Sequence, residues 1–204
     1  MKTVVVAAVI SLFLSSCAIT GQPRSLENAK KCGELTCDSA GQPITGKRVV
    51  KYPDGNLSFE ANFKDGKREG LAKTYYINGN LKAEINYKDG RLDGLTETYY
   101  KSGNLKSEIN FRDGKLEGLA KAYHENGILK SETNYKNGQK EGLAKTYYIN
   151  GNLWAETNYK NGKQDGLKKT YDVSGNLKSE ANFKDGQLEG LAKTYHENGN
   201  LESE

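Results

Sequence analysis

The chain has 204 residues, of which 35% are hydrophobic, and its 30 basic and 26 acidic residues leave a formal net charge of +4. So little apolar material can cover one face of a sheet but cannot fill a large globular interior. Lys and Glu alternate through most of the chain without a long run of one sign, which argues against the clustered basic surface of a nucleic-acid-binding protein.

The first residues have the pattern of an export signal. Lys2 supplies a positive charge, and residues 3–14 form an apolar segment that is short for a transmembrane helix. The sequence Leu14-Ser15-Ser16-Cys17 resembles the bacterial lipoprotein signal, which implies cleavage before Cys17 and lipidation of that cysteine. We therefore predict a lipoprotein signal peptide over residues 1–16 and a lipid anchor on Cys17, because two or more acyl chains hold a protein stably at a membrane. A plain signal peptide is the alternative.

Residues 17–45 are predicted to form the lipidated cysteine and a linker. This segment is rich in Gln, Pro, Ser and Asn and has no clear periodicity. Cys32 and Cys37 are an even pair in an exported chain, so we expect a disulfide that closes a small loop, with free thiols as the alternative. No further Cys or His lies nearby in the sequence to complete a metal site.

From residue 46 to residue 204 the sequence repeats every 24 residues. Self-similarity at a fixed period is the signature of a repeat architecture. Residues 46–55 form a divergent half-repeat, as is typical of a terminal cap. The glycines that open successive copies are Gly55, Gly79, Gly103, Gly127, Gly151, Gly175 and Gly199.

Each repeat contains two strand patterns joined by a tight turn. Residues 81–87 alternate apolar with polar side chains, which indicates a strand. Asp89-Gly90 follows, and Asp-Gly or Asn-Gly at this place favours a type I′ hairpin turn. Residues 142–148 of a later copy are rich in Thr and Tyr and also predict a strand. Three glycines per repeat leave no segment long enough for a stable helix.

The predicted fold is therefore all-β, with about fourteen strands between Lys47 and Leu201 in an antiparallel meander. At ~4.8 Å per strand this elongated sheet would extend on the order of 65 Å. A further glycine four residues after each turn, such as Gly94, indicates a β-bulge. We expect the bulge to bring Leu95 and Tyr99 to the face that carries Tyr87, which would also place Glu97 among these apolar residues.

The repeat unit Gly-Asn-Leu-Lys-x-Glu-x-Asn-Tyr-x-Asp/Asn-Gly-x-x-x-Gly-Leu-x-x-x-Tyr-Tyr resembles the bacterial variant of the MORN repeat over residues 46–204. The resemblance implies tandem β-hairpins in an elongated, twisted antiparallel sheet with ladders of Tyr, Phe and Leu. Proteins of this kind include YwqK-type antitoxins, and other MORN proteins scaffold assemblies or lie near membranes.

Two tyrosine columns supply candidate binding residues. The first, from Tyr75 to Tyr195, never varies and suits packing. The second admits His and Asp, so we expect it to meet water, where Tyr can stack on sugar rings or hold a peptide. The repeated Glu and Asn are expected on the solvent side, with Glu opposite Lys or Thr; cation or glycan binding is the alternative. The candidate binding surface is Tyr76, Tyr100, His124, Tyr148, Trp154 and His196.

The chain offers little for catalysis, because its only two histidines replace tyrosines of the repeat. We expect no enzymatic activity, no cofactor and no metal site. The sequence predicts a lipid-anchored protein of the cell envelope, at the outer membrane or cell surface if the organism is Gram-negative. Its sheet would bind or scaffold a protein partner. An antitoxin or immunity-type neutraliser and a glycan- or cell-wall-binding module are the alternatives, and nucleic acid is not an expected partner.

Overall fold

A computed structural model describes residues 30–32 and 35–204, so the predicted signal peptide and Cys17 lie outside the described residues. The described chain forms strands and turns with no helix. None of it forms a helix of the length and apolarity that a bilayer-spanning segment requires. The strands are β1 (Lys30–Cys32), β2 (Leu35–Cys37), β3 (Gly46–Lys51), β4 (Leu57–Lys64), β5 (Lys67–Tyr75), β6 (Leu81–Lys88), β7 (Arg91–Tyr99), β8 (Leu105–Arg112), β9 (Lys115–Leu116), β10 (Gly118–Tyr123), β11 (Leu129–Lys136), β12 (Gln139–Tyr147), β13 (Leu153–Lys160), β14 (Lys163–Tyr171), β15 (Leu177–Lys184), β16 (Gln187–Tyr195) and β17 (Leu201–Ser203).

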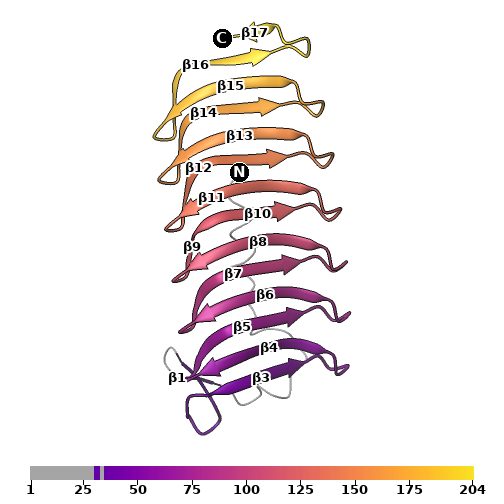
Figure 1. Cartoon of the computed structure of the whole chain (residues 1–204), viewed down its shortest axis with the longest axis vertical. Helices are drawn as coiled ribbons and strands as arrows, with labels where there is room; N and C mark the ends of the chain where they lie inside the picture. The colour runs from indigo at the N-terminus through magenta and orange to yellow at the C-terminus, as the bar shows by residue number, and fades with distance from the viewer. Residues whose placement is uncertain (1–29, 33–34) are drawn as a thin grey trace.

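Strands β3 to β17 make one antiparallel sheet in which each strand pairs with its neighbours in the sequence. Strand β9 is a two-residue piece that pairs with β8 ahead of β10, so the pair β9–β10 occupies the place of one strand. Figure 1 shows an open, elongated sheet that rises by one hairpin per repeat. The predicted all-β meander of about fourteen strands is confirmed.

The tight turns join each repeat to the one before it. Asp89 has a φ of 49° and Gly90 a φ of 80°, the left-handed pair that a type I′ turn requires. The Gly90 amide donates to the Arg68 carbonyl at 2.9 Å, and the Asp89 amide donates to the Glu69 carboxylate at 2.9 Å. Equivalent backbone contacts recur at Gly114, Gly138, Gly162 and Gly186. The carboxylate three residues after each turn glycine therefore caps the next turn, a role that the sequence pattern did not reveal.

The turns at the opposite edge of the sheet are wider. The Tyr76 amide donates to the Asn80 carbonyl at 2.8 Å, and Gly79 adopts a φ of 85°. The Asn80 side-chain amide donates to the Lys101 carbonyl of the next wide turn at 2.8 Å. Successive repeats are thus connected at both edges of the sheet as well as through the strand pairing.

The bulge is present, but its effect on the faces differs from the prediction. Ile85 pairs with Thr96 and Tyr87 pairs with Leu92, so Asn86 alone lies opposite three residues of β7. Two extra residues leave the alternation of the pleat unchanged, whereas one would invert it. Leu95 therefore lies on the opposite face from Tyr87, and the expectation that Leu95, Glu97 and Tyr99 join the face of Tyr87 is wrong.

The best-buried part of the sheet lies in its first half, on the face that carries Ile85 and Ile109, each 1% exposed. One core cluster extends from Ile44 to Tyr87 and a second from Ile109 to Tyr135. Many of the buried residues on this face are Ala, Thr or Ser, which lie between larger neighbours on adjacent strands. The corresponding residues of β13 to β16 are mostly half-buried or exposed.

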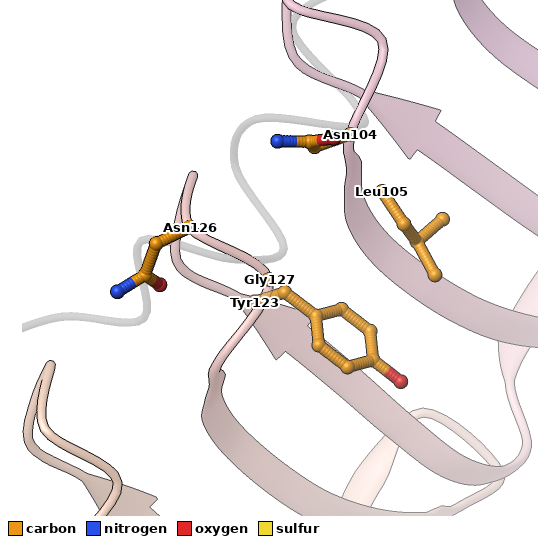
Figure 2. Close-up of a pocket in the computed structure, with 5 residues that line it drawn as sticks. All are labelled: Asn104, Leu105, Tyr123, Asn126 and Gly127. Atoms are coloured by element: carbon orange, nitrogen blue, oxygen red, sulfur yellow. The ribbon is translucent and has the colours of Figure 1, made fainter.

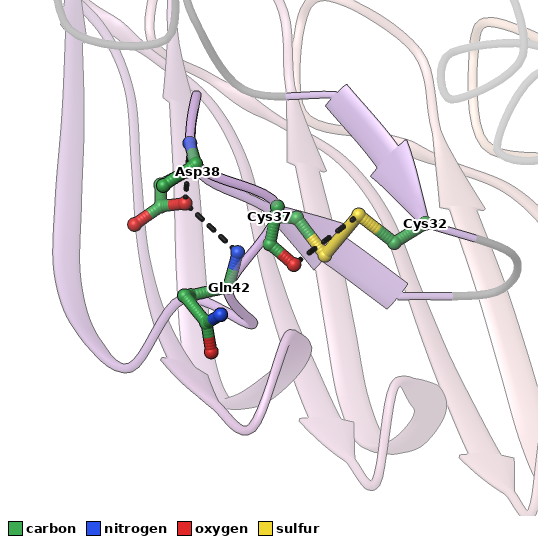
Figure 3. The surroundings of a disulfide bond; sticks show 6 residues. Cys32, Cys37, Asp38 and Gln42 are labelled. Atoms are coloured by element: carbon green, nitrogen blue, oxygen red, sulfur yellow. Dashed lines mark hydrogen bonds between the residues drawn. A yellow bond between two sulfur atoms is a disulfide. The ribbon is translucent and has the colours of Figure 1, made fainter.

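The hairpin of β1 and β2 covers the first tight turn. The Thr36 amide donates to the Gly66 carbonyl, and the Gly66 amide donates to the Ile44 carbonyl. A disulfide joins Cys32 to Cys37, next to a loop in which Asp38 accepts from the Gln42 amide (Figure 3). Thr36 and Ile44 thus supply the contacts to the first tight turn that a preceding repeat would otherwise give.

Candidate interaction surfaces

The strand pairing divides the side chains between two faces. We call the face of Tyr87, Ile85 and Thr96 the aromatic face, because Phe or Tyr occurs there on every second strand. We call the opposite face, which carries Glu84 and Asn86, the charged face. The aromatic row comprises Phe63, Tyr87, Phe111, Tyr135, Tyr159 and Phe183.

The charged face has a row in which Glu and Lys alternate from strand to strand. Glu60 lies opposite Lys73, which lies opposite Glu84, and the Lys73 ammonium is 2.5 Å from the Glu84 carboxylate. The hydrogen bond that the Lys73 ammonium donates to Glu84 raises the pKa of Lys73. Hydrogen bonds from Lys47 and Tyr75 lower the pKa of Glu60. The predicted placement of Glu opposite Lys on a polar face is confirmed.

One residue interrupts this alternation. Glu97 occupies the place of Lys, so Glu84, Glu97 and Glu108 lie opposite one another on three consecutive strands. Like charges directly opposite destabilise a strand pair. Among the described residues, no group of three or more His, Cys, Asp or Glu has an arrangement that could hold a metal ion.

The first tyrosine column also lies on the charged face. The Tyr147 hydroxyl donates to the Glu132 carboxylate at 2.8 Å, and Tyr75, Tyr123, Tyr171 and Tyr195 make the same contact with the Glu fifteen positions earlier. Tyr99 instead donates to Glu97, at 3.2 Å. Burial, together with the nearby carboxylate, raises the pKa of Tyr147 to about 12.

The second tyrosine column links repeats. The Tyr76 hydroxyl donates to the Tyr99 carbonyl at 2.8 Å, and the Tyr100 hydroxyl donates to the Tyr123 carbonyl at the same distance. The ammonium of Lys82 lies 5.7 Å from the centroid of the Tyr76 ring. Burial raises the pKa of both Tyr76 and Tyr100. These two predicted binding residues are half-buried, and each uses its hydroxyl inside the fold.

The other four predicted binding residues differ among themselves. Tyr148 donates to the Tyr171 carbonyl at 2.9 Å, and its ring centroid lies 6.4 Å from that of Trp154, which is 47% exposed. His124 is too short to make the tyrosine bridge, and its Nε2 is a buried nitrogen without a hydrogen-bond partner. His196 is exposed.

A third row on the charged face was not singled out from the sequence. The leucine that follows each bulge glycine lies beside an Asn of the next strand, as Leu143 does beside Asn158. Four of these leucines have the same exposed fraction, 38%, and Leu191 is 66% exposed. We call this set the leucine row: Leu71, Leu95, Leu119, Leu143, Leu167 and Leu191.

Comparison with known families agrees with this geometry. A family profile described as MORN repeat variant matches residues 44–65, 68–89, 92–113, 116–137, 140–161, 164–185 and 188–204. The chain belongs to the MORN repeat variant family. No curated protein matches the chain.

One solved structure shows a limited similarity to the chain. A mutant of S. aureus TarM, in complex with Fondaparinux, alpha-GlcNAc-glycerol and UDP, is 13% identical, with a TM-score of 0.32. The match covers 47% of the present chain and 19% of that chain. A likeness of this size carries no inference about the ligand of the MORN repeats.

A shallow hollow of about 260 Å³ occurs where the third MORN repeat meets the fourth. It is lined by Asn104, Leu105, Tyr123, Asn126 and Gly127 (Figure 2). The next wide turn has Ile128 where other repeats have the bridging Asn. The long faces offer far more surface for binding than this hollow.

Proposed function

We propose that the protein is a lipid-anchored component of the cell envelope whose MORN sheet binds a protein partner through its charged face. The signal pattern and Cys17 support the anchor. The leucine row supports the interface, and it is the observation on which the proposal depends. In this proposal the MORN repeats form a binding or scaffolding surface, and the lipid anchor holds that surface at the membrane.

The leucine row has the composition of a protein interface. One partly exposed leucine occurs on every second strand, about 9.6 Å from the next. Asn side chains lie between the leucines, and the alternating Glu and Lys row lies beside them. Apolar groups surrounded by polar and charged ones are typical of surfaces that bind proteins.

The charges beside the leucine row restrict the kind of partner. The Glu–Lys alternation is close to neutral over most of the sheet, so it suits a partner surface of mixed charge. At Glu84, Glu97 and Glu108 the local charge is negative, which favours basic residues on the partner at that point. We therefore propose an extended partner surface with apolar contacts and a local basic group.

The anchor is tested by fractionation of cells that produce the full chain or its Cys17→Ser variant. We expect the full chain in the membrane fraction and the variant in the soluble envelope fraction. A Cys17→Ser protein that stays in the membrane fraction would remove the anchor from the proposal.

The interface is tested by chemical crosslinking in intact cells followed by mass spectrometry. We expect the double variant Leu119→Ser, Leu143→Ser to lose the crosslinked partner. The matched control is Leu188→Ser, which removes an exposed leucine from the aromatic face. Retention of the partner by the double variant would contradict the proposed interface. The identity of the partner would separate a scaffold from the neutraliser that the family resemblance also suggests.

A further inference from the structure

The aromatic face changes its chemistry along the sheet. In the first half the residues between the aromatic rings include Leu92 and Leu116, which contact the two core clusters or belong to them. On β12 and β14 the equivalent residues are Lys140 and Gln164, whereas β16 again has a leucine, Leu188. Lys168 also replaces the Ala or Thr that occupies this place in the repeats from Ala72 to Ala192. From β12 to β14 this face is therefore polar and basic between its rings.

The two lysines lie against aromatic rings. The Lys140 ammonium is 4.6 Å from the centroid of the Tyr159 ring, and the Lys168 ammonium is 5.9 Å from that of Phe183. Within the described part of the chain, no carboxylate forms a salt bridge with either lysine. Both ammonium groups thus keep hydrogen-bond donors available to an anion.

The charge of this face has one sign. The charged strand residues that the pairing places there are all basic: Arg48, Arg68, Lys140 and Lys168. The acidic strand residues of the repeats lie on the charged face or at the turns. The aromatic face therefore attracts an anion, and its two accessible lysines lie in the half where the rings are least buried.

The spacing of the rings points to a periodic ligand. Tyr135, Tyr159 and Phe183 occupy alternate strands, so they are separated by about 9.6 Å along the sheet. That distance is close to the length of two sugar rings in an extended polysaccharide. The C–H groups of a sugar ring pack against the electron-rich face of an aromatic ring, and carboxylates on the same polymer can reach the lysines.

We propose that the aromatic face of β12 to β15 binds a linear anionic polysaccharide of the polyuronate type. Tyr159 and Phe183 stack against sugar rings, Lys140 and Lys168 bind carboxylates, and Gln164 donates or accepts a hydrogen bond between them. An acidic peptide would satisfy the lysines, but its flexible carboxylate side chains have no planar apolar surface for the rings. The site lies on the face opposite the leucine row, so the two surfaces can be tested independently.

The test measures binding of an oligogalacturonate to the full chain by isothermal titration calorimetry. An uncharged oligosaccharide of equal length and poly-glutamate serve as comparison ligands. The double variant Lys140→Leu, Lys168→Ala restores the residues of other repeats, so it retains the fold, which circular dichroism checks. The matched control Lys145→Gln, Lys169→Gln removes two charges from the same two strands on the charged face.

We expect the first double variant to weaken oligogalacturonate binding by about tenfold and the control by less than about twofold. Tyr159→Leu, which keeps an apolar group in place, should also weaken binding of the polyuronate while leaving its salt dependence unchanged. Equal losses in the two double variants, equal affinity for poly-glutamate, or no binding by the unaltered chain would overturn the proposal. Partner crosslinking that depends on Leu119 and Leu143 would be unaffected by any of these outcomes.

Discussion

Replacing His124 with the tyrosine that four other repeats have at this place should stabilise the protein. In four repeats a tyrosine at this place donates to a carbonyl in the next repeat, at 2.7 to 2.9 Å. His124 leaves the Tyr147 carbonyl without this donor, and its own Nε2 is buried without a partner. We predict that His124→Tyr restores the bridge and stabilises the sheet where the fourth and fifth MORN repeats meet.

The size of the effect follows from two contributions. A net hydrogen bond contributes about 0.5–1.5 kcal/mol, and removal of a buried unsatisfied polar atom contributes about 1–3 kcal/mol. Since the His124 side chain as a whole is only half-buried, we expect a total of about 2 kcal/mol. For a domain of this size that corresponds to a rise of about 4–8 °C in Tm if the whole sheet unfolds together.

Thermal unfolding followed by circular dichroism measures this change, and hydrogen exchange at β10 to β12 locates it. Local exchange matters because repeat arrays can unfold in parts, so a single Tm need not report every junction. The reverse variant, Tyr100→His, should lose a similar amount of stability between the third and fourth MORN repeats. Unchanged Tm and unchanged exchange in His124→Tyr would refute the view that the second tyrosine column links repeats.

Three further predictions concern the charged face and the bulges. Glu97→Lys should stabilise the sheet by about 1 kcal/mol in low salt, because it replaces two like-charge pairs with opposite-charge pairs. The gain in stability should be smaller in high salt. Urea unfolding at two salt concentrations measures both effects. The pKa of Tyr147 rises from 10.0 to about 12 on folding, so its contribution to stability is full below pH 10 and is lost as pH rises to about 12. Tyr147→Phe should therefore reduce the loss of stability at alkaline pH. An unchanged pH profile of unfolding would contradict the raised pKa of Tyr147. Gly94→Ala should destabilise the protein more than Gly118→Ala. Both glycines have positive φ, which costs about 1–2 kcal/mol for Ala, but only at Gly94 would the new Cβ lie 3.3 Å from the Asn86 Cβ. Equal losses of stability in denaturant unfolding would show that crowding has no effect at Gly94.

The fold could be predicted because its determinants are local. Asp89-Gly90 specifies a type I′ turn from two residues, and the alternation over residues 81–87 specifies a strand. The bulge could be located from Gly94, but the number of residues it contains depends on the pairing with β6. That number decides which face each later side chain occupies, so the faces of Leu95 and Tyr99 could not be assigned from the sequence.

The candidate sites were harder to predict, because side chains of one repeat form hydrogen bonds to the next repeat. The Tyr76 hydroxyl reaches a carbonyl 23 residues later, and a periodic sequence looks the same whether such a residue binds a ligand or links repeats. The useful signals in the sequence were residues that differ from those at the same place in the other repeats. His124 and Ile128 depart together at one junction, and Lys140 and Lys168 depart on one face, but only the pairing shows that these residues are neighbours.

The most direct test of the account is a photo-crosslinking amino acid placed at Leu143 in the leucine row of the full chain, in intact cells, and separately at Gln164 on the aromatic face. We predict a discrete protein adduct from position 143 and none of comparable yield from position 164. Protein adducts of equal yield from both positions, or from position 164 alone, would contradict the claim that the charged face of this sheet binds the protein partner.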